Sequence, residues 1–194
     1  CFSSISSDGS SFTYTFLLQP TDPNYHNTDQ GIGAYFGLQL FAPGVTGFKS
    51  DGDTTDGIRI DKQASLKFTL AEDAVWYGTK SGGSNNGHNA DVKVSLVLGH
   101  FALKDSKACN IAVQAIFTPT SASAQTYQLE LDQFTAVSES CNVSGLNAAN
   151  ELATYPIVQI KMEAAAANVT ASVQTPRDPT YPTAITLTGP ITFQ

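Results

Sequence analysis

The chain has 194 residues, and an all-β chain of this length commonly folds as one unit, so we expect a single domain over residues 1–194. Hydrophobic residues make up 41% of the sequence and charged residues 14%, a balance that argues against disorder. The net charge of −7 does not provide the basic surface that nucleic acid and anionic membranes attract, and no apolar run approaches the roughly 18 residues of a transmembrane helix.

Alternating apolar and polar residues, rich in β-branched and aromatic types, run along the chain and predict strands. The predicted strands, in chain order, are residues 12–18, 34–41, 58–60, 65–70, 74–77, 91–98, 110–118, 126–131, 157–162, 168–173, 185–188 and 191–193. Residues 80–90 predict a loop, and residues 147–154 predict one helical turn that ends before Pro156. The pattern predicts an all-β fold, a two-sheet antiparallel β-sandwich (jelly roll) with one short helical turn.

The chain carries 21 Thr and 18 Ser, so hydroxyl groups replace charges on its surface, which suits a secreted or cell-surface protein. Its three cysteines are an odd number for such a protein. Cys109 and Cys141 flank a hairpin pattern, and we predict a disulfide between them. Cys1 is then either a lipid-modified terminus or, as we favour, an incidental thiol at a processing boundary. Asn142 and Asn168 begin acceptor triplets that are used only in a glycosylating host.

The sequence contains no catalytic motif. His26, His88 and His100 lack the spacing of a metal centre, and there is no Gly-x-Ser-x-Gly elbow. Glycoside cleavage needs two facing carboxyl groups, and Glu130 and Asp132, two positions apart on a predicted strand, are the only pair that we consider. We expect this pair on a solvated strand face, so we predict that the protein is not an enzyme.

The densest acidic cluster is Asp51, Asp53 and Asp56, in a loop that also contains Gly52 and Gly57. Carboxylate oxygens suit calcium, so these three residues are our candidate ligands for a structural calcium ion. Their spacing is not that of an EF-hand. A solvated turn, in which the Asp side chains cap backbone amides, is the alternative that we favour.

Sugar rings stack their C–H faces on exposed aromatic rings, so aromatic residues on strands are candidate glycan contacts. The candidates are Tyr35, Trp76, its neighbour Tyr77, and Tyr127, with Arg59, His100 and Gln128 as sources of directional hydrogen bonds. Tyr127 shares its strand face with Leu129 and Leu131, which indicates the core and makes Tyr127 the weakest member of the platform.

Four segments in the second part of the chain follow one another as an aromatic-led strand, a turn, a hydrophobic strand and a final strand. They are residues 127–134, 146–152, 157–160 and 185–193. In this order the chain resembles the second half of galactose-binding-like jelly-roll domains, a group that includes carbohydrate-binding modules of polysaccharide-degrading enzymes. The resemblance implies a glycan-binding sandwich. Members of the group often hold calcium through an acidic residue of the final strand, and residues 185–193 contain none.

These features predict an extracellular, non-catalytic carbohydrate-binding module that recognises a polysaccharide by aromatic stacking on one sheet face, either free or attached to a larger enzyme. The alternative is a structural subunit of a cell-surface or extracellular filament, because Thr-rich strands with few charges suit self-assembly equally well. A small glycan hydrolase or lyase that uses Glu130 is a third hypothesis.

Overall fold

The computed structural model describes residues 2–5, 12–17, 26–27, 35–42, 44, 53, 55–60, 64–74, 79–80, 83–84, 91–104, 107–119, 121–138, 143–165, 175–176 and 183–194. Within them the chain forms mostly strands, with one α-helix, α1 (Ala148–Thr154), and one 3-10 turn, Leu131–Gln133. None of the helical structure in this set has the length and apolarity needed to cross a membrane.

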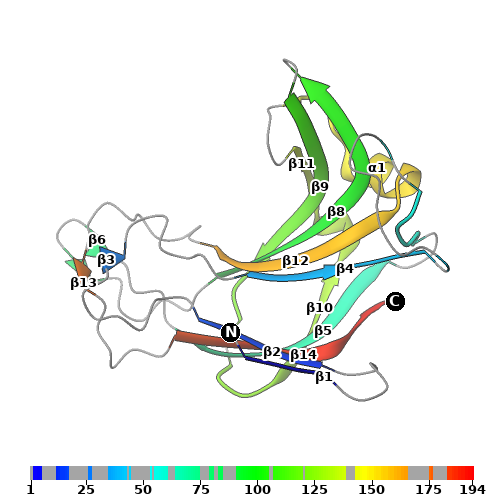
Figure 1. Ribbon diagram of the computed structural model, residues 1–194. Helices are drawn as coiled ribbons and strands as arrows, with labels where there is room; N and C mark the ends of the chain where they lie inside the picture. The colour runs from blue at the N-terminus through cyan, green and yellow to red at the C-terminus, as the bar shows by residue number, and fades with distance from the viewer. Residues whose placement is uncertain are drawn as a thin grey trace.

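Among the described residues, two five-stranded antiparallel sheets make up the body of the fold (Figure 1). The first sheet has the order β1 (Phe2–Ile5), β2 (Phe12–Leu17), β14 (Thr183–Phe193), β5 (Ser65–Ala74) and β10 (Gln125–Glu130). The second has the order β11 (Thr135–Ser138), β9 (Lys107–Phe117), β8 (Asp91–Lys104), β12 (Ile157–Ala165) and β4 (Tyr35–Gln39). Two short ribbons pair β3 (His26–Asn27) with β13 (Thr175–Pro176), and β6 (Thr79–Lys80) with β7 (Gly83–Ser84).

The strand order is that of a jelly roll. Without the edge strands β1 and β11, the sheets read β2-β14-β5-β10 and β4-β12-β8-β9. Along the chain, these eight strands alternate between the two sheets except at the β8–β9 hairpin, which pairs within the second sheet. This is the arrangement of two Greek keys that defines a jelly roll, and it confirms the predicted fold class.

The core lies between the two sheets because alternate residues of each strand point inward. Leu66, Phe68 and Leu70 of β5 and Val94 and Leu96 of β8 are each no more than 1% exposed. Ile185 and Leu187 of β14 join the same cluster from the first sheet. The period-two pattern that predicted the strands therefore also predicted which face of each strand packs in the core.

Residues 58–60 do not form the predicted strand. Ile58 makes one isolated antiparallel bridge to Ile157, the first residue of β12. The pairing does not extend, because the next ladder position opposite Ile60 is Tyr155, whose N–H already bonds to the Glu151 carbonyl of α1 at 2.9 Å, and the next position on the other side, Gln159, pairs with Gln39 of β4. The segment crosses the end of β12 rather than adding a strand beside it.

Several strand limits also differ from the prediction. β5 runs from Ser65 to Ala74, so it includes the predicted strand 65–70 and the first residue of the predicted strand 74–77. Residues 75–77 and the predicted strand 168–173 lie outside the described residues. The two predicted C-terminal strands are one, β14, with a register shift between Thr188 and Thr192.

The second sheet is larger than predicted. β8 continues past residue 98 to Lys104, because a register shift between Val97 and Phe101 absorbs extra residues without ending the pairing. The four-residue strands β1 and β11 were not predicted.

Shortening a core side chain tests this packing. Leu96→Ala removes a side chain that is 0% exposed, and we expect it to lower the free energy of unfolding by about 2 to 5 kcal/mol. Ile116→Ala is the control, because Ile116 is 51% exposed, and it should change stability by less than about 0.5 kcal/mol. Urea denaturation followed by circular dichroism measures both. Equal losses for the two variants would contradict the assignment of the core.

Candidate functional site

A hollow of about 780 Å³ lies beside α1, within the range of volumes typical of ligand sites. Its apolar lining includes Ile60, Leu131, Phe134, Leu146 and Leu152, together with four alanines at 64, 148, 149 and 153. Its polar lining consists, among the described residues, of Glu130, Asp132 and Asn147. An apolar surface with a few polar groups is the usual character of a small-molecule or glycan site.

The acidic wall of the hollow comes from the end of β10 and the 3-10 turn that follows it. Leu131 and Phe134 are 8% and 3% exposed, and their spacing of three residues matches the period of a 3-10 turn. Because both of these side chains are buried, β10 stops at Glu130, and Asp132 lies exposed between them. Glu130 and Asp132 therefore do not share one strand face as predicted, because Asp132 lies in the 3-10 turn, yet both line the same hollow.

Gln128 fixes the orientation of Glu130. Its side-chain amide Nε2 donates to Glu130 Oε1 at 2.9 Å, along the exposed face of β10. Gln128 was predicted to contact a glycan directly. In the structure Gln128 does not line the hollow but bonds to Glu130, which does, and a direct contact between Gln128 and a glycan stays a prediction.

The opposite wall is the short helix α1, which forms where the sequence predicted it. The side chain of Asn147 caps its start by accepting from the Asn150 N–H at 3.0 Å, and Pro156 follows its last turn. Residues Ala148, Ala149, Leu152 and Ala153 face the hollow, so this wall is made mostly of small side chains.

Arg59 hydrogen-bonds to the C-terminal end of α1. Its Nη2 donates to the Ala153 carbonyl at 2.7 Å and its Nη1 donates to the Thr154 carbonyl at 3.0 Å. These carbonyls lie at the negative end of the helix dipole, where a cation is stabilising. Arg59 was also predicted as a glycan contact, and its bonds place it at the helix terminus beside the hollow.

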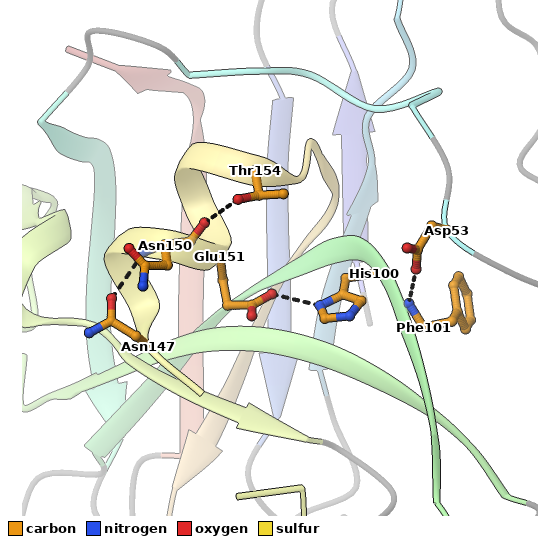
Figure 2. Close-up of polar contacts among 7 residues, drawn as sticks. All are labelled: Asp53, His100, Phe101, Asn147, Asn150, Glu151 and Thr154. Carbon is orange, nitrogen blue, oxygen red and sulfur yellow. Dashed lines mark hydrogen bonds and ion pairs between the residues drawn. The ribbon is translucent and has the colours of Figure 1, made fainter. Parts of the chain in front are cut away.

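A second polar cluster holds the other side of α1 against β8. Figure 2 shows Glu151 pointing from the helix toward His100, with Glu151 Oε2 at 2.6 Å from His100 Nδ1. The His100 and Tyr155 rings stack with centroids 4.0 Å apart and an interplanar angle of 7°. Beside them, Asp53 Oδ1 accepts the Phe101 N–H at 2.8 Å (Figure 2). His100 thus acts as an anchor for the helix.

The predicted aromatic platform is not brought together by the described residues. Tyr127 lies in the first sheet, and its ring packs on Phe68 and Phe117 of the core, with a buried hydroxyl that has no partner. Tyr35 begins β4 in the second sheet, where its backbone pairs with Glu163. Trp76 and Tyr77 lie outside the described residues.

The calcium and disulfide predictions are each described only in part. Asp53 caps the Phe101 amide, the backbone carbonyl of Asp56 accepts the Ala42 N–H at 2.6 Å, and Asp51 is outside the described residues. Across the described part of the chain, no group of three or more His, Cys, Asp or Glu side chains is placed to hold a metal ion. The calcium site remains a prediction.

Cys109 is fully buried and disulfide-bonded. Its predicted partner, Cys141, lies outside the described residues, as does Cys1, so the pairing itself stays a prediction.

The hollow was missed by the sequence analysis even though several of its residues were visible. Asn147 and Pro156 marked the helix, and Glu130 and Asp132 were singled out as a pair. Nothing in the sequence indicated that α1 would lie across from the end of β10, because that contact joins segments about 20 residues apart through tertiary packing. The His100–Glu151 contact had no sequence signal either.

Comparison of the chain with protein-family models, with curated proteins and with solved structures gives no match.

The cluster around Tyr155 makes a titration prediction. Burial raises the pKa of the Tyr155 phenol above 10.0, and the negative charges of Asp53 and Glu151 raise it further. The pKa of Tyr155 is higher in the folded state than in the unfolded state. The contribution of its neutral phenol to the free energy of unfolding is therefore present below pH 10.0 and is lost as the pH rises through the folded-state pKa. Glu151→Gln should therefore lower the pKa of Tyr155 toward its ordinary value.

NMR of ring-labelled tyrosine measures this change, with Tyr155→Phe used to assign the resonance. Glu163→Gln is the control, since Glu163 pairs with Lys93 at 2.7 Å on β12 and β8, away from this cluster. A Tyr155 pKa that is the same in Glu151→Gln and in the wild type would contradict the electrostatic account.

Proposed function

We propose that the protein is an extracellular glycan-binding module and that it holds its sugar in the hollow beside α1. The observation that carries the proposal is the pairing of an apolar lining with carboxylate and amide groups in one hollow of about 780 Å³. A sugar has both features, because its ring carries apolar C–H faces and its rim carries hydroxyl groups. Apolar contact and hydrogen bonding can then be satisfied at the same time.

The polar groups of the hollow suit hydroxyl recognition. A carboxylate accepts several hydrogen bonds, so Glu130 and Asp132 can each take bonds from sugar hydroxyls, and the Asn147 amide group can both donate and accept. The Gln128 amide already holds one oxygen of Glu130 at 2.9 Å, which fixes the direction of the remaining acceptor sites. A pre-oriented acceptor lowers the entropy lost on binding.

We propose binding without cleavage, and we place the protein outside the cell. The disulfide at Cys109 and the hydroxyl-rich, weakly charged composition support an oxidising, extracellular setting. The contact surface in this proposal differs from the aromatic sheet face predicted from sequence. It uses the residues of the β10 end and of α1 instead of a stacking platform.

A glycan array followed by isothermal titration calorimetry tests the proposal. We expect the intact chain to bind at least one polysaccharide or oligosaccharide, and Glu130→Gln and Asp132→Asn to weaken that binding about tenfold each, the effect of losing about 1.4 kcal/mol. Glu163→Gln removes a carboxylate of β12 that is outside the hollow and should bind as the wild type does.

Three results would count against the proposal. Unchanged affinity in both hollow variants would place the glycan elsewhere on the chain. Release of reducing sugar from the bound polysaccharide would favour the hydrolase or lyase hypothesis. Absence of glycan binding together with large oligomers in sedimentation would favour the structural-subunit alternative.

A further inference from the structure

The walls of the hollow come from segments that are far apart in sequence. Ile60 and Ala64 belong to the stretch before β5, whereas Ala148, Leu152 and Ala153 belong to α1. A sugar that contacts both walls is held well only if the distance between them is constant. The interaction that ties one wall to the other is therefore as important for affinity as the groups that touch the sugar.

The helix wall has little of its own to hold it in place. α1 has seven residues, and none of them is fully buried. A helix of two turns is marginal in water without tertiary contacts, so the position of α1 depends on its partly buried contacts with the core and on its polar tethers.

The other wall is fixed to β12. Ile58 and Ile157 exchange two backbone hydrogen bonds of 2.8 Å, and Gly57 lies so close to β12 that a Cβ at this position would overlap the Ile157 carbonyl. Arg59 and Ile60 follow directly, so the backbone that carries them starts from a rigid point.

Arg59 joins the two walls. Its backbone is one residue from Ile60 of the first wall, and its guanidinium donates at 2.7 and 3.0 Å to two successive carbonyls at the end of α1. One of these, Ala153, itself lines the hollow, whereas Arg59 does not. The planar guanidinium can satisfy two neighbouring acceptors at once, which a lysine ammonium on its flexible stem does less well.

We infer that Arg59 is a positioning residue, which sets the separation of the two walls and so the affinity of the hollow for its glycan without touching the glycan. This inference rests on the proposed function. Its geometric part, that Arg59 holds α1 in place, stands by itself and is tested separately.

The affinity test compares Arg59→Ala and Arg59→Lys with the wild type, each titrated with the oligosaccharide that the array identifies. We expect Arg59→Ala to bind about tenfold more weakly and Arg59→Lys to fall between the two, at an unchanged midpoint of urea unfolding. Millimolar guanidinium ion should restore part of the affinity of Arg59→Ala, whereas sodium chloride at equal ionic strength should not. A loss of global stability alone would show no such chemical rescue.

The positioning test uses amide hydrogen exchange and needs no ligand. In Arg59→Ala, the amides of Glu151 and Tyr155, which bond to the carbonyls of Asn147 and Glu151, should exchange about tenfold faster, while the amide of Leu96 in β8 should not change. Lys93→Ala, which breaks the ion pair to Glu163, is the control and should leave α1 exchange unchanged.

The outcomes separate the two claims. Wild-type exchange of α1 in Arg59→Ala, or wild-type affinity in that variant, would overturn the inference about Arg59. If the wild type bound no glycan, the proposed function would fail, and the exchange experiment would still decide whether Arg59 positions α1.

Discussion

The buried residue Ile157 is the point on which the candidate site depends. It is 0% exposed, it begins β12, and it exchanges two backbone hydrogen bonds with Ile58. Tyr155 and Pro156 connect α1 to Ile157. Ile58, which bonds to Ile157, is followed directly by Arg59 and by Ile60 of the hollow. Two of the segments that line the hollow, α1 and the stretch that contains Ile60, are therefore linked to one fixed position in the second sheet. The packing of the sandwich core determines that position, which connects the fold to the site.

The polar contacts around α1 then have a common role. Arg59 bonds the helix terminus, and His100 bonds Glu151 and stacks on Tyr155, so the helix is held from two directions. On the facing wall, Gln128 orients Glu130. Of the residues that the sequence suggested as ligand contacts, Arg59 and Gln128 bond to residues that line the hollow, and His100 bonds to Glu151 of α1. A binding site built in this way is rigid before its ligand arrives, which reduces the entropy cost of binding.

The sequence was sufficient for the fold and insufficient for the site. Alternation along β5 and β8 predicted both the strands and their buried residues, because one face of each strand must be apolar. The helix was predictable from Asn147 and Pro156, whose effects on the backbone are local. The hollow was not predictable, because it depends on which face of α1 meets the end of β10. Arg59 bonds to carbonyls that lie 94 and 95 positions further along the chain, and no local pattern encodes such a contact.

Mapping glycan binding on the protein by NMR tests our proposal that a glycan occupies the hollow beside α1. An oligosaccharide that binds in the array is titrated into isotope-labelled protein, and the backbone amide shifts are followed. We expect the largest shifts on residues 130–132, 147–149, 152 and 153, which line the hollow. Shifts confined to the opposite faces of β8 and β12, around Lys93 and Glu163, with none at the hollow, would contradict it.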